Sequence, residues 1–183
     1  MSLERKQPSK NKLAYSAKEC AYLAAFVSLV IALQFVFSFV PGVELVTALL
    51  ISYSFTMGVR RGMLAATAFS LLRQLVFGFS PTVLILYLLY YNLLTLLFGG
   101  IGHKVKRPVK ALPWLTVLAS LCTVCFTLLD NLITPLWYAY TAKAAKLYFY
   151  ASLPFMLPQV VCTAVSVFCL LLPLRRAFLL FKK

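Results

Sequence analysis

Three ionisable side chains interrupt apolar stretches of the chain and are the first candidates for chemistry. Glu44 begins one stretch, while Arg73 and Asp130 each lie near the end of another. A charged group at membrane depth is costly, so it usually marks a binding site or a paired structural contact. Counting a rise of about 1.5 Å per residue along helices, we expect all three at a similar depth. They predict either a pocket, where Arg73 contacts an anionic or carbonyl group and the acids accept donors, or an internal salt bridge from Arg73 to Glu44 or Asp130.

Amide and phenol side chains near the same depth extend the candidate pocket. Tyr87, Tyr90 and Tyr91 follow one another at helical spacing, which suits either stacking on a flat ring or ordinary core packing. The expected substrate-binding residues are Glu44, Arg73, Gln74, Tyr87, Tyr91, Asn92, Asp130, Asn131 and Gln159.

Signals for catalysis, metals or cofactors are weak. The single histidine, His103, lies in a basic loop, which favours a solvated residue over a general base. The pair Cys122 and Cys125 has CxxC spacing but no further ligands nearby. No GxxxxGK phosphate loop is present. We therefore expect no enzymatic activity, no metal and no cofactor.

The residues between these polar groups indicate a membrane protein. Hydrophobic residues make up 62% of the 183 positions, and residues 20–43, 111–129 and 147–174 carry no charge. Each block is close to or beyond the roughly 20 residues that cross about 30 Å of hydrocarbon. The fold class we predict is all-α, a polytopic bundle of six transmembrane helices.

The turn signals divide the chain into six spans within one membrane domain, residues 19–174. A basic segment, residues 1–18, precedes it, and a basic tail, residues 175–183, follows. We expect residues 134–152 to be the longest connection, with aromatics at a membrane interface. The expected spans cover about residues 19–40, 43–57, 63–77, 82–101, 112–133 and 153–174.

The distribution of cations predicts the orientation. Of the 18 lysines and arginines, only Arg73, Lys143 and Lys146 lie away from the ends expected to face inward. The positive-inside rule then places both termini in the cytoplasm, with the chain in the cell (plasma) membrane. The net charge of +14 is explained by contact with the lipid bilayer, and no nucleic-acid partner is expected.

A stripe of small residues marks a face of the first span. Ala17, Ala21 and Ala25 repeat every four residues, which lets another helix approach closely. The spacing fits a docking surface for a second membrane protein and internal packing equally well.

Residues 39–102 resemble the first four helices of a substrate-binding S component of an energy-coupling factor (ECF) importer. The similarity lies in the PGVEL junction (residues 41–45), the basic turn GVRRG (58–62) and the FGFSP turn (77–81). The stripe at Ala17, Ala21 and Ala25 also resembles the face with which such subunits contact their coupling protein.

This resemblance implies a six-helix ABC-importer subunit with a ligand site near the outer surface. The implied partners are a transmembrane coupling protein (T component), two ABC-type ATPases and a vitamin-like micronutrient. Arg73 and a total of two tryptophans depart from the Trp-rich pocket expected for thiamin, and no ligand subgroup follows. The alternatives are a stand-alone small-solute transporter or channel, and a structural membrane protein with an internal Arg–acid pair.

Overall fold

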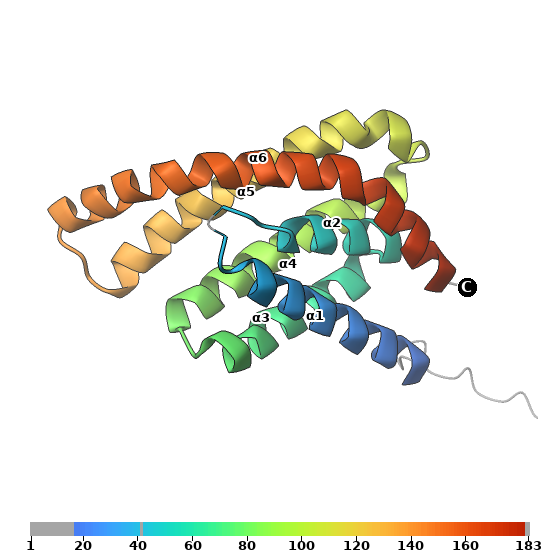
Figure 1. The fold of residues 1–183 in the computed structure, drawn as a ribbon, viewed down its shortest axis with the longest axis horizontal. Helices are drawn as coiled ribbons and strands as arrows, with labels where there is room; N and C mark the ends of the chain where they lie inside the picture. Colours follow the sequence, from blue (N-terminus) through green and yellow to red (C-terminus); the bar gives the residue numbers. More distant parts are fainter. Residues whose placement is uncertain (1–16, 41, 182–183) are drawn as a thin grey trace, which may run out of the picture.

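The computed structural model describes residues 17–40 and 42–181, and this part of the chain is all-helical (Figure 1), as predicted. The predicted segment 1–18 lies outside the described residues except for its last two. The helices are α1 (Ala17–Phe37), α2 (Val46–Met57), α3 (Val59–Phe77), α4 (Pro81–Lys104), α5 (Pro108–Trp137) and α6 (Ala142–Phe181).

Successive helices run in alternating directions through one bundle. In Figure 1 the start of α1, the end of α6 and the α2–α3 and α4–α5 turns lie toward the same end. We call this the basic end, because it carries Arg60, Arg61, residues 104–110 and Arg175–Arg176. The described residues of the other three connections, 38–40 with 42–45, 78–80 and 138–141, form the opposite end. Which end faces the cytoplasm remains a prediction from the charge distribution.

Four helices, α1, α4, α5 and α6, are long and apolar enough to cross a membrane. Helix α2 has 12 residues, a length of about 18 Å, which is too short for a full crossing. Helix α3 has 19 residues, but Arg60, Arg61 and Arg73 lower its hydropathy. The six helices are therefore present, while six full crossings remain a prediction.

Helix α2 forms the centre of the bundle. Every residue from Val46 to Thr56 is buried, and the helix packs mainly against α3, α4 and α6. Two of its hydroxyl groups bond to carbonyls within the helix: Ser52 Oγ donates to the Ala48 carbonyl at 2.7 Å, and Thr56 Oγ1 to the Ser52 carbonyl at 2.8 Å. Buried polar groups are thereby satisfied without water.

Glycines bring α4 very close to α2 at the basic end. A Cβ atom at Gly102 would lie 2.2 Å from the backbone oxygen of Phe55, a distance no side chain tolerates. At the α2–α3 turn, Gly58 has φ +92°, which favours glycine. Gly58 alone separates α2 from α3, so the predicted turn over residues 58–62 is wrong in extent: residues 59–62 form the first turn of α3.

The prediction of a long connection over residues 134–152 is wrong, because α5 and α6 both continue into it. Only residues 138–141 connect the helices. Helix α5 ends in a Schellman motif: the Tyr140 N–H bonds the Pro135 carbonyl at 2.9 Å, and Ala139 has φ +48°. Thr141 Oγ1 then accepts the Ala144 N–H at 3.3 Å as the cap that begins α6.

Candidate functional site

An amide of α1 joins Arg73 to α4 near the opposite end of the bundle. Arg73 Nε on α3 donates to Gln34 Oε1 at 3.2 Å. The Gln34 Nε2 group in turn donates to the Tyr87 hydroxyl at 3.1 Å. Both polar atoms of the Gln34 side chain are thus engaged, and three helices are fixed relative to one another.

The guanidinium group of Arg73 lies against two aromatic rings. Its Cζ atom is 4.5 Å from the Phe77 ring centroid and 4.7 Å from that of Tyr87. Such cation–π contacts stabilise a charge that has left water. Among residues 17–40 and 42–181, Arg73 forms no ion pair, so neither predicted salt bridge, to Glu44 or to Asp130, is present.

The carboxylate of Glu44, just before α2, is held by three other side chains. Its Oε1 atom accepts the Tyr91 hydroxyl at 3.0 Å and the Thr47 hydroxyl at 2.8 Å. Its Oε2 atom accepts Nε2 of Gln159 on α6. Glu44 therefore links α4 and α6 to the N-terminal end of α2.

Arg73 and Glu44 line one cavity, which we call the Arg73 cavity. Its volume is about 380 Å³, within the range of small-molecule sites. Its walls come from the opposite end of the bundle, where α1, α3 and the residues before α2 meet α4, α5 and α6. The polar lining includes Gln34, Glu44, Arg73 and Gln159, and the aromatic lining is Phe37, Phe77, Tyr87, Phe126 and Phe155.

Asp130 lies in a different cavity, of about 370 Å³, between α5 and α6. Its carboxylate accepts the Thr134 hydroxyl at 2.9 Å and the Tyr148 hydroxyl at 2.8 Å. Gln159 contributes to the lining of both cavities. The structure therefore brings together Glu44, Arg73, Tyr87 and Gln159 but places Asp130 apart.

The other predicted residues support the helices around the cavity. Tyr91 is buried, and its hydroxyl orients Glu44. Gln74, Asn92 and Asn131 are outside the lining of the Arg73 cavity and tie neighbouring segments together. Their contacts are Gln74 Oε1 with the Ser80 N–H at 3.1 Å, Asn92 Oδ1 with the Thr67 hydroxyl at 3.1 Å, and Asn131 Nδ2 with the Ser152 hydroxyl at 2.8 Å.

Sequence reasoning missed Gln34 and the phenylalanines of the lining. The sequence did contain a signal for Gln34, since it is the one amide between Cys20 and Phe37. A polar group within an apolar helix is costly in a membrane and usually marks a binding site or a paired contact. Phe126 and Phe155 carried none, because phenylalanine is common in apolar helices.

The small-residue stripe lies on the outside of the bundle. Ala17, Ala21 and Ala25 on α1 are all exposed. They leave an open strip of α1 near the basic end.

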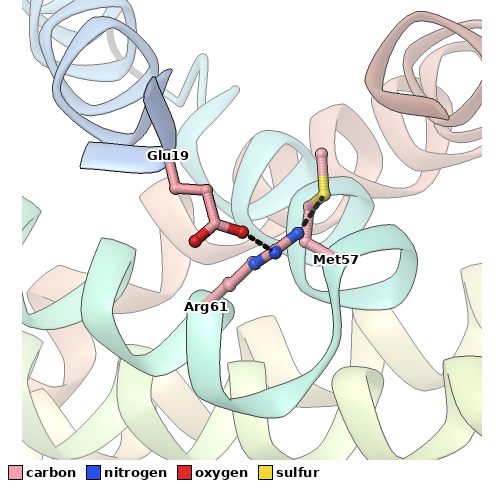
Figure 2. A network of polar contacts seen from close by, with 3 residues as sticks. All are labelled: Glu19, Met57 and Arg61. Atoms are coloured by element: carbon pink, nitrogen blue, oxygen red, sulfur yellow. Dashed lines mark hydrogen bonds and ion pairs between the residues drawn. The ribbon is translucent and has the colours of Figure 1, made fainter. Parts of the chain in front are cut away.

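An ion pair anchors the same part of α1. Figure 2 shows Glu19 of α1 paired with Arg61 of α3. Arg61 Nη1 also donates to Met57 Sδ at 3.6 Å. These contacts fix the start of α1 to the α2–α3 turn.

Comparisons with protein families, curated proteins and solved structures give no match. The resemblance to ECF S components therefore stays a prediction. The geometry of the Arg73 cavity is the basis for assigning a function.

Proposed function

We propose that the chain is the substrate-binding S component of an ECF-type importer. It captures a small vitamin-like micronutrient at the extracellular side and delivers it inward with an ATPase-driven coupling module. The observation that carries this proposal is the Arg73 cavity, which holds an arginine without an acidic partner among the described residues. A purely structural arginine at membrane depth would be expected to pair with an acid.

The charge distribution supports an outward opening. The basic end belongs in the cytoplasm by the positive-inside rule. The Arg73 cavity is lined by residues 38, 40 and 42–46 of the opposite end and by Phe77, next to the α3–α4 turn. The ligand therefore enters from outside the cell in this proposal.

The stripe at Ala17, Ala21 and Ala25 supports a partner at the basic end. Its exposed small side chains allow a second helix to approach α1 closely. A transmembrane coupling protein occupies this surface in the proposal, and two ABC-type ATPases supply the energy. In this proposal the stripe lies toward the cytoplasmic side of the membrane, which is where the ATPases work.

Affinity purification of the tagged full chain from its own host membranes tests this function. We expect one coupling protein and two ATPases to co-purify in fixed stoichiometry. Ala21→Trp and Ala25→Trp should abolish the association, because an indole fills the space that the partner helix needs. Val117→Trp is the matched control, since Val117 is also exposed but lies on α5, and it should leave the complex intact.

Two outcomes would contradict the proposal. The first is a purified chain that carries no such partners while the Trp variants behave as wild type. The second is solute uptake by liposomes that contain this chain alone, which would indicate a stand-alone transporter or channel.

A further inference from the structure

The Arg73 cavity contains one cation and one anion that do not bond to each other. A guanidinium group has five N–H donors. Only Nε of Arg73 has a hydrogen-bond acceptor among the described residues, which is Gln34. The Nη groups of Arg73 thus have donors left for a ligand.

Glu44 and Gln159 retain acceptor capacity in the same cavity. A carboxylate offers about four acceptor positions, and Tyr91, Thr47 and Gln159 occupy three of those on Glu44. Because a carboxylate can only accept, Gln159 presents its NH₂ group to Glu44. Its carbonyl oxygen then has no donor among the described residues and is available to a ligand.

Because the cavity holds a cation and an anion that do not pair with each other, only some classes of ligand can bind there without leaving a charge desolvated. A neutral apolar ligand would remove water from both charges and replace it with nothing, which is costly. A ligand with a single charge would compensate Arg73 or Glu44 and leave the other one desolvated. A ligand with an anionic group and a hydrogen-bond-donating group satisfies both, since charge-assisted bonds are the stronger ones.

The aromatic lining of the Arg73 cavity is suited to binding a ring. Tyr87, Phe126 and Phe155 line the cavity together with Arg73 and Glu44. Aromatic side chains stack on flat rings with favourable offset or edge-on geometry. A flexible polar chain would gain much less from these walls.

We propose that the ligand is an aromatic or heteroaromatic ring compound with a carboxylate or phosphate at one side and an amino or ring N–H donor at the other. The anionic group binds the Arg73 Nη groups, and the donor binds Glu44 and Gln159. This inference rests on the proposed function and specifies its substrate class.

The test uses the purified full chain and a soluble small-molecule extract of its own host as the probe. The protein is incubated with the extract and washed, and retained compounds are identified and quantified by mass spectrometry. Wild type should retain a ring compound that has both groups. Retention should fall roughly 10- to 100-fold in Arg73→Gln and in Glu44→Gln, the loss expected for a charged hydrogen bond. Lys146→Gln, an exposed cation outside the cavity, should retain it as wild type does.

Arg73→Lys keeps the experiment decisive if Arg73→Gln fails to fold. Lysine preserves the charge but lacks the forked donors, so an intermediate loss is expected. The inference is overturned if the retained compound lacks either group, if it is a phospholipid, or if folded variants at Arg73 and Glu44 bind it normally. If wild type retains no compound at all, the proposed function itself fails.

Discussion

Replacing Gln34 with glutamate should make the protein more stable and a weaker binder. In the structure the Gln34 amide oxygen lies 3.2 Å from Arg73 Nε. A carboxylate at this position would form an ion pair with Arg73, and the Tyr87 hydroxyl would donate to it instead of accepting. The engineered acid thus competes with an anionic ligand for the same guanidinium.

The size of both effects follows from this geometry. Two unit charges about 4 Å apart attract by about 4 kcal/mol at an effective dielectric constant of 20. Desolvation offsets part of this, which leaves about 1 to 3 kcal/mol. At about 2 to 4 °C per kcal/mol for a chain of this size, the melting temperature should rise by several degrees. Ligand retention should fall roughly 10- to 100-fold, because Arg73 is already neutralised.

Thermal unfolding in detergent and retention of the extracted compound measure the two effects on the same samples. Gln34→Met is the matched control: it removes both amide bonds, so it should lower stability and binding together. A Gln34→Glu variant that binds as tightly as wild type would refute the role of Arg73 as the anion-binding group. A variant less stable than wild type would refute the pairing geometry.

Three further predictions concern the scaffold. Gly102→Ala should lower stability by about 1 to 3 kcal/mol or prevent folding, seen as a lower melting temperature or aggregation, because its Cβ would overlap the Phe55 carbonyl. Glu19→Gln should increase the mobility of a spin label placed at the start of α1, because the substitution removes the ion pair with Arg61. Unchanged mobility would count against the role of this ion pair in holding α1. Ala139→Gly should raise the free energy of unfolding by about 0.5 to 1 kcal/mol, seen as a slightly higher melting temperature, because glycine adopts the φ of +48° without strain; a lower melting temperature would contradict this.

Much of the fold could be predicted because glycine and proline mark several turns. Gly58 separates α2 from α3, and Gly78 ends α3 within the FGFSP segment. The extent of α5 and α6 could not be predicted in the same way. Helix α5 continues past residue 133, where the predicted span ends, and the Schellman motif at Ala139 and Tyr140 decides where it stops.

The site could be predicted in part, because helix rise gives depth but no angular position. Depth alone placed Arg73, Glu44 and Asp130 at a similar level. The first two line the Arg73 cavity, while Asp130 lines the cavity between α5 and α6. The angle at which a side chain leaves its helix depends on packing against neighbours, which apolar sequences specify weakly. The hydrogen bond between Gln34 and Arg73 could not be predicted for the same reason, because it depends on the angle at which each side chain leaves its helix.

Labelling of a single cysteine at Ser38 tests the central claim most directly. Ser38 is exposed and lines the Arg73 cavity, so Ser38→Cys reports on it once the five native cysteines are replaced. A membrane-impermeant maleimide should label this residue in intact cells, and the retained compound should slow the labelling. Labelling that occurs only after the membrane is permeabilised would contradict an extracellular capture site.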